Sequence, residues 1–159
     1  MTTIAFNQFE IAADTQAINC GIIEQTPYQK IFVKDGRVYA LAGLAALLPQ
    51  LVRWYEDGAD PAKVPTFKAK EENWFGEFIV YDSERFIHYC PLPDFPYGSE
   101  VPPPFALGTG AKFAMGAMLA GKTPFEAVEI ASKLDNDTGG MIQTVDLRKF
   151  TKPRLLGSF

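Results

Sequence analysis

The chain has 159 residues, 47% of them hydrophobic and 21% charged, which predicts one soluble globular domain with a substantial core. Its net charge of −4 disfavours nucleic acid or an anionic membrane surface as the main partner. No apolar run reaches transmembrane length, and no basic residue precedes Lys30. We therefore expect neither a membrane span nor a signal peptide, and a cytoplasmic location.

The first predicted element is a β-hairpin that starts beside the initiator methionine. Apolar runs flank Asn7-Gln8, and a turn of two or three residues there brings Thr2 opposite Ala13 or Asp14. Removal of the methionine would give Thr2 a nucleophilic hydroxyl and a general base, its own α-amine, whose pKa is ordinarily ~7.7–8.0. A threonine after methionine is also common in proteins that make no use of it, so these residues alone do not establish catalysis.

The next strand, predicted over residues 28–33, contains a charge that is out of place. Lys30 stands among aromatic and branched apolar residues, where an interior strand rarely holds a lysine. It either blocks sheet-to-sheet pairing on an edge strand or is a desolvated ammonium beside Thr2. In the second case it would favour a neutral amine and a more acidic hydroxyl, and Asp14 would pair with it. Taken alone, Asp14 is a strand-end or turn aspartate.

A second hairpin and a helix follow. Asp35-Gly36 is a strong hairpin turn, and leucines at helical spacing predict a helix with Pro49 near its first turn. Residues 59–73 hold two prolines and a charged cluster, so we expect a loop with at most a short helix. The strands and helix predicted for this half cover residues 28–33, 37–42, 44–55, 75–81 and 85–90.

The second half begins with a proline-rich segment and contains two adjacent helices. Six of the twelve prolines lie between Pro91 and Pro104, which predicts an extended excursion. Thr123-Pro124-Phe125-Glu126 is a capping box with proline at the first helical position. Several hairpins and two adjacent helices predict an α+β fold of stacked antiparallel sheets with helices outside. The strands and helices predicted here cover residues 105–110, 111–120, 124–134 and 141–147.

Cysteine and histidine are scarce, which limits the possible chemistry. Cys20 and Cys90 are too few and too far apart for a disulfide framework or a metal site, so we expect buried thiols in a reducing compartment. His88 lies in an alternating strand pattern, where a structural role is expected rather than that of a base. No metal or cofactor is predicted.

In combination these segments resemble the N-terminal-nucleophile (Ntn) hydrolases of the proteasome β-subunit and bacterial HslV protease group, over nearly the whole chain. The matching stretches are residues 2–6, 12–17, 30–31, 42–43, 107–110, 126–129 and 135–140. The resemblance implies a single domain over residues 1–147 and a basic C-terminal tail at 148–159. The fold it implies is a four-layer αββα sandwich of two antiparallel sheets.

The resemblance also assigns the reaction centre. It implies that Thr2 is the nucleophile, its α-amine the base, and Lys30 with Asp14 the activating pair. The backbone N–H of Gly43 would donate to the oxyanion, a contribution worth ~2.7–4 kcal/mol in acyl transfer.

Further positions follow from the same resemblance. Asp135 and Thr138 would support the amine by hydrogen bonds, and Thr109 stands where the family usually has serine. The positions of the family's specificity pocket fall on Ala17, Tyr28, Leu41 and Ala45. Because that lining is apolar, we expect cleavage after bulky hydrophobic residues of peptides or unfolded proteins. The implied assembly is a homo-oligomeric ring, with two stacked rings of six or seven subunits, around an enclosed chamber.

Three features depart from the family pattern. Leu44 replaces a second glycine after the oxyanion glycine and would narrow the site. Residues 59–73 are too short and proline-broken for the second long helix of one outer layer, which is therefore shortened or missing. Docking of an ATP-dependent unfoldase cannot simply be carried over for that reason. Finally, Met1 acylates the amine until it is removed.

Three rival functions remain open. Residues 116–123 fit the phosphate-loop pattern GxxxxGK[ST], but no strand precedes them and their middle continues a predicted helix. The chain could be a ring-forming scaffold that no longer cleaves, or a small-molecule amidase that uses the same threonine chemistry.

Overall fold

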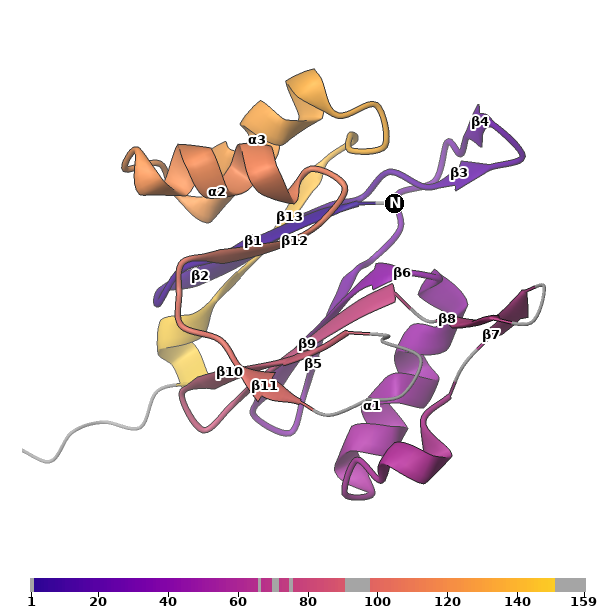
Figure 1. The fold of residues 1–159 in the computed structure, drawn as a ribbon. Helices are drawn as coiled ribbons and strands as arrows, with labels where there is room; N and C mark the ends of the chain where they lie inside the picture. The colour runs from indigo at the N-terminus through magenta and orange to yellow at the C-terminus, as the bar shows by residue number, and fades with distance from the viewer. Residues whose placement is uncertain (1, 66, 70–71, 75, 91–97, 151–159) are drawn as a thin grey trace, which may run out of the picture.

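The computed structural model describes residues 2–65, 67–69, 72–74, 76–90 and 98–150. They form four layers, with two antiparallel sheets packed face to face and helices on both outer sides (Figure 1). The predicted αββα sandwich is confirmed. None of the helices in the described ranges is long and apolar enough to cross a membrane.

The first sheet has four strands in the order β12-β1-β2-β13, all antiparallel. These strands are β1 (Thr3–Phe6), β2 (Glu10–Asp14), β12 (Phe105–Gly108) and β13 (Ile142–Asp146). The chain's first strand is therefore central in this sheet, with β12 on one side and β2 on the other. Because Thr2 directly precedes β1, it lies at the end of the sheet at which β1 begins, between β12 and β2.

The turn of the first hairpin lies one residue later than predicted. Ile4 pairs with Ala13, and the Asn7 N–H donates to the Glu10 carbonyl, so the turn is centred on residues 8–9. The Asn7 side chain accepts the backbone N–H groups of Phe9 and Glu10, which satisfies the turn locally. Continued by two residues, this register sets Thr2 opposite Thr15. The predicted cross-strand partners of Thr2, Ala13 or Asp14, are therefore both wrong.

The second sheet has five strands in the order β11-β10-β9-β6-β5. They are β5 (Ile31–Lys34), β6 (Arg37–Gly43), β9 (Gly76–Asp82), β10 (Arg85–Tyr89) and β11 (Ser99–Glu100). Asp35 and Gly36 have φ values of 51° and 74°, the left-handed pair that a two-residue hairpin turn requires, so the predicted Asp-Gly turn is confirmed. The strand expected from residue 28 begins only at Ile31.

The hydrophobic core between the two sheets explains their stacking. Phe6 of β1 is fully buried and stacks on Phe86 of β10, with ring centroids 3.8 Å apart. Burial of one such aromatic side chain stabilises the fold by roughly 1.5–3 kcal/mol. Ile4, Ile11, Ile31, Val38, Ile79 and Leu107 are buried in the same cluster.

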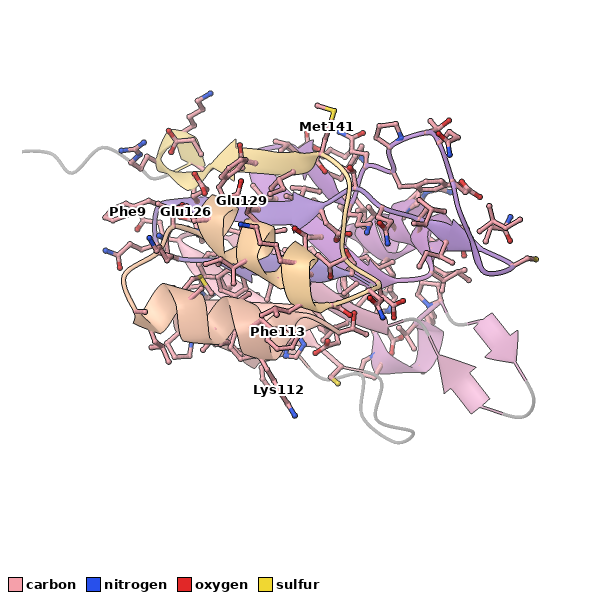
Figure 2. All side chains as sticks on the ribbon, turned by 90° about the horizontal axis from the view of Figure 1, so that it is seen from above. Phe9, Lys112, Phe113, Glu126, Glu129 and Met141 are labelled. Atoms are coloured by element: carbon pink, nitrogen blue, oxygen red, sulfur yellow. The ribbon has the colours of Figure 1, made fainter. Side chains whose placement is uncertain are left out.

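Two helices, α2 (Ala111–Leu119) and α3 (Pro124–Leu134), cover the four-stranded sheet. Figure 2 looks down on this layer, with Lys112 and Phe113 on α2 and Glu126 and Glu129 on α3. The capping box is present, because Thr123 Oγ1 accepts the Glu126 N–H and the Glu126 carboxylate accepts the Thr123 N–H. Alanines line the contact and let the helices approach the strands closely: Ala5, Ala12, Ala106, Ala114 and Ala127.

The opposite outer layer holds the α-helix α1 (Leu48–Glu56), which follows the short helix η1 (Ala45–Leu47). Pro49 lies in the first turn of α1, where proline is tolerated. The predicted loop over residues 59–73 contains the short helix η2 (Pro61–Lys63) and a small hairpin, β7 (Phe67–Ala69) and β8 (Glu72–Trp74). The described part of this segment therefore supplies no second long helix, as predicted.

The segment after Asp14 and the C-terminal tail differ in part from the prediction. The polar stretch after Asp14 contains a small hairpin that was not predicted, formed by β3 (Ile18–Asn19) and β4 (Ile22–Ile23). Cys20 at its turn is exposed, so the prediction of two buried thiols is wrong for this residue. The basic tail begins within the short helix η3 (Leu147–Phe150), and residues 151–159 lie outside the described residues.

Candidate active site

Three buried polar side chains meet at one end of the sandwich. Thr2 precedes β1, Asp14 ends β2 and Lys30 precedes β5, so the two sheets together bring them into contact. Lys30 Nζ donates to Thr2 Oγ1 at 2.7 Å and lies 3.0 Å from Asp14 Oδ1. Thr2 Oγ1 also donates to Asp14 Oδ1. The hydroxyl of Thr2 therefore lies between an ammonium and a carboxylate.

Asp14 is fully buried and its carboxylate is held by several donors. The Thr3 N–H donates to Oδ1 and the Gly139 N–H donates to Oδ2, each at 3.0 Å. A buried carboxylate needs such hydrogen bonds together with an ionic partner, because desolvation alone strongly disfavours the charge. These donors fix the carboxylate against both Thr2 and Lys30.

Lys30 is held at both its ends. Its Nζ donates to the Gln16 carbonyl at 2.7 Å, and its backbone N–H donates to Gln143 Oε1 at 3.2 Å. Burial lowers the pKa of the Lys30 ammonium from its ordinary value, while the charge of Asp14 opposes that shift. Lys30 lies next to the edge strand β5, yet its side chain is buried, so blocking of sheet pairing does not account for it.

A second polar cluster lies on the other side of β1. Asp135 Oδ2 accepts the hydroxyls of Thr109 and Thr138, both at 2.6 Å. The Thr138 hydroxyl is in turn 2.7 Å from the Thr3 hydroxyl. Burial raises the pKa of the Asp135 carboxyl, but the donated hydrogen bonds outweigh it and leave the pKa below its usual range. The cluster thus reaches the residue directly after Thr2.

Two glycines permit the close approach of β12 and its turn to the first residues of the chain. Gly108 has a φ of 90°, and a Cβ atom there would collide with the Thr2 carbonyl oxygen. A Cβ atom on Gly110 would collide with Thr3 Oγ1. Glycine is required at Gly108 because the Thr2 backbone lies against it, and at Gly110 because the side chains of Thr3, Ala131 and Thr138 fill the space around it.

Thr2 opens into a cavity of about 420 Å³. Gly43, at the end of β6, lines this cavity together with Lys30 and with Leu44, the residue that replaces the second glycine. The four predicted specificity positions, Ala17, Tyr28, Leu41 and Ala45, all line it as well. The cavity is thus mainly apolar, with Glu24 among its lining residues.

The structure also answers the phosphate-loop alternative. Gly116 lies inside α2, and Lys122 and Thr123 lie between α2 and α3. A phosphate loop needs its glycine-rich turn directly after a strand and before a helix, and this segment runs from helix to helix. The match to the pattern is therefore accidental.

Several residues of the site were not predicted from the sequence. Gln16 and Gly139 hold the buried ion pair, and Gln143 of β13 accepts the N–H of Lys30 and of Ile31. Glu77 of β9 accepts the Gly108 N–H at 2.9 Å. The only signal for Gln143 is a polar side chain within a strand, which is too common to indicate this role.

Several solved structures have a similar fold. Two structures of Thiobacillus denitrificans BPH match, one of them in complex with epoxomicin; they have TM-scores of 0.68 and 0.67 and are 16% and 17% identical. Each alignment covers 91% of this chain and 96% of the other. Eukaryotic HslV from Trypanosoma brucei matches with a TM-score of 0.64 and 17% identity, over 91% of this chain and 97% of the other. No family model and no curated protein matches the sequence.

Proposed function

We propose that this protein, whose fold is that of HslV and proteasome-like proteins, is a threonine peptidase with Thr2 as its nucleophile. The observation that supports this most strongly is the contact of Thr2 Oγ1 with both Lys30 Nζ and Asp14, beside an apolar cavity. A buried ion pair contributes little to stability because of its desolvation cost. Placement of such a pair on a threonine hydroxyl favours a chemical role for it.

The proposed reaction requires removal of Met1, which leaves Thr2 with a free α-amine. Thr2 Oγ1 attacks the carbonyl carbon of the scissile amide while the α-amine takes the hydroxyl proton. The Lys30 ammonium stabilises the developing oxygen nucleophile, and Asp14 holds Lys30 in place. The tetrahedral intermediate collapses to an ester on Thr2, and the amine product leaves with a proton from the α-amine. Water, activated by the same amine, then hydrolyses the ester.

The two other parts of the site take supporting roles in this proposal. The Gly43 backbone N–H stabilises the oxyanion, since Gly43 lines the same cavity as Thr2. Asp135, with Thr109 and Thr138, orients the freed amine through the residue next to it. No metal or cofactor takes part in these steps.

The substrate class follows from the cavity. Leu41, Ala17 and Ala45 give it an apolar wall, and Tyr28 adds an aromatic face. Such a lining favours a bulky hydrophobic side chain directly before the scissile bond. We therefore propose peptides or unfolded proteins as substrates.

Assembly into a ring is part of the proposal. Large apolar side chains are exposed on the β3–β4 hairpin, on β5 and on the helix layer. They include Ile22 on β4, which is 70% exposed, and Leu119 at the end of α2, which is 73% exposed. Apolar surface of this kind on a water-soluble chain favours contacts with other subunits. Two stacked rings of six or seven copies would enclose the cavities, and an ATP-dependent unfoldase would then be needed to admit folded proteins.

The test uses a fusion whose cleavage leaves Thr2 as the first residue. Hydrolysis of fluorogenic peptides is measured for a series that differs only in the residue before the scissile bond, and native mass spectrometry gives the number of subunits. We expect that the protein assembles into a ring and cleaves peptides after large apolar residues. The Thr2→Ala variant should show no cleavage. Hydrolysis of small amides but not of peptides would favour the amidase, and an intact ring without any hydrolysis would favour the scaffold.

A further inference from the structure

A second group of reactive side chains lies outside the cavity of Thr2. Glu77 belongs to β9 and His88 to β10, and Cys90 is the first residue after the end of β10. Tyr89 pairs with Phe78 across the two strands, so one further step of the register sets Cys90 opposite Glu77. His88 is two residues from Cys90 and therefore lies on the same face. We propose that Glu77, His88 and Cys90 bind a divalent transition-metal ion of the zinc class.

The distances suit a single ion. One ligand atom from each residue lies within 4.8 Å of the others, and His88 Nε2 is 3.3 Å from Glu77 Oε1. Zinc holds nitrogen, oxygen and sulfur ligands at ~2.0–2.3 Å, so tetrahedral ligands are roughly 3.3–3.8 Å apart. The cluster needs only small side-chain adjustments to reach that geometry.

The hydrogen bonding of the cluster also points to a ligand. His88 Nε2 is buried and makes no well-aligned hydrogen bond, although Glu77 Oε1 is close. The contact of Nε2 with Glu77 Oε1 is poorly aligned for a hydrogen bond, and a metal ion bound by both atoms would satisfy both of them. Glu77 Oε2 is already engaged by the Gly108 N–H, which orients the carboxylate and leaves Oε1 for the ion.

The donor set selects the metal. A thiolate and an imidazole favour zinc, cobalt or ferrous iron over magnesium or calcium, which take oxygen ligands. Three protein ligands leave one position for water. A thiol must lose its proton to bind the metal, so binding weakens as the pH falls. The Glu77 side chain is 28% exposed, so an ion can approach the cluster from solvent at this carboxylate.

Such an ion would brace the end of the sandwich. It would join β9 to β10, and the Glu77 carboxylate would extend that link to Gly108, whose backbone lies against Thr2. The metal would therefore stabilise the turn beside the proposed nucleophile without entering the cavity. Neither the metal site nor its test depends on the proposed peptidase activity.

The test titrates Co²⁺ into the full-length reduced protein without oxygen. We expect one cobalt ion per chain, a thiolate-to-cobalt charge-transfer band in the near ultraviolet and the visible bands of tetrahedral cobalt. Zn²⁺ added in equal amount should remove these bands. Cys90→Ser should abolish the charge-transfer band, and His88→Gln should weaken cobalt binding at least tenfold.

Cys20→Ser is the matched control, because Cys20 is exposed on the β3–β4 hairpin and far from Glu77 in sequence. It should leave the bands and the affinity unchanged. Circular dichroism establishes that each variant is folded, and Zn²⁺ should raise the melting temperature of the parent protein but not of Cys90→Ser. Absence of a thiolate band in the parent protein, or its loss in Cys20→Ser and not in Cys90→Ser, would overturn the proposal.

Discussion

Two polar clusters flank the start of β1, and they differ in charge and in burial. Lys30 and Asp14 form a buried ion pair on the Thr2 hydroxyl. On the other side, Asp135 receives hydrogen bonds from Thr109 and Thr138 and is only partly buried. The first cluster acts on the oxygen that would attack the substrate. The second reaches only Thr3, so its influence on the reaction is indirect.

The comparison predicts unequal effects of mutation. A desolvated charge next to a reacting atom stabilises developing charge strongly, because little solvent screens it. A partly exposed carboxylate that holds two hydroxyls and orients a neighbouring residue contributes mainly through geometry, which the remaining contacts partly preserve. Each variant below is prepared with residue 2 as the first residue and is assessed by peptide hydrolysis and by thermal unfolding.

The largest effect is expected for Thr2→Ala, which removes the nucleophile. We expect a loss of at least roughly 10³-fold in kcat/KM with a folded protein. Thr144→Ala is the control, since Thr144 is an exposed threonine on β13, and it should retain full activity. Residual cleavage by Thr2→Ala at more than a hundredth of the parent rate would assign the nucleophile to another residue.

Lys30→Ala should lower kcat by ~10²–10³-fold, as expected when one charge-stabilising donor is removed. Lys34→Ala is its control, because Lys34 pairs with Glu56 at the surface and surface ion pairs contribute little. Comparable losses in the two lysine variants would contradict the special role of the buried one.

The pH dependence separates the two partners of the ion pair. Burial lowers the pKa of Lys30, so activity should fall on the alkaline side at a pH below the ordinary lysine value of 10.5. Asp14 opposes that shift, so Asp14→Asn should move the alkaline limb to still lower pH. The desolvated charge of Lys30 destabilises the fold most below its folded pKa, and that cost should diminish as the pH rises towards 10.5. An alkaline limb unchanged in Asp14→Asn would show that Lys30 does not control it.

A smaller effect is expected for Asp135→Asn, in the second cluster. The amide oxygen still accepts one hydroxyl, so we expect a loss of about 10-fold in kcat and of about 1 kcal/mol in stability. Asp137→Asn, two residues further on in the same loop, serves for comparison. A loss in Asp135→Asn as large as in Lys30→Ala would erase the distinction between the two clusters.

Two glycine variants test backbone geometry. Gly108→Ala should lower the free energy of unfolding by about 1–3 kcal/mol and reduce activity, because its Cβ would displace the Thr2 backbone. Gly116→Ala is the matched control, since nothing lies within 4 Å of the added Cβ on α2. It should be neutral or stabilising by up to about 1 kcal/mol. Retained activity in this variant also counts against a phosphate loop, whose first glycine it removes.

Much of the fold could be predicted from local signals. The Asp35-Gly36 turn and the Thr123 capping box follow from backbone preferences that need no tertiary contact. The first turn was misplaced by one residue because Asn7 accepts hydrogen bonds from the turn rather than occupying its centre. The β3–β4 hairpin was missed because a two-residue strand leaves no periodic pattern.

The site was predictable only in part. Lys30 stood out because a charge among apolar residues is unusual, and Thr2 because it follows the initiator methionine. Asp14 alone was an ordinary strand-end aspartate, and its role came from the possible pairing with Lys30 and from the family resemblance. Gln143 and Glu77 did not, because their roles depend on segments far apart in the sequence. The approach of Cys90 to Glu77 likewise depends on the pairing of β9 with β10, which no short motif encodes.

The most direct measurement is covalent labelling with epoxomicin, a peptide epoxyketone, followed by intact-mass and peptide mass spectrometry. This warhead requires both the hydroxyl and the free amine of an N-terminal threonine. With protein verified to begin at Thr2, we expect one adduct per chain on the first peptide, absent in Thr2→Ala and suppressed in Lys30→Ala. Folded, processed protein that stays unlabelled at saturating epoxomicin would contradict the assignment of Thr2 as a working nucleophile.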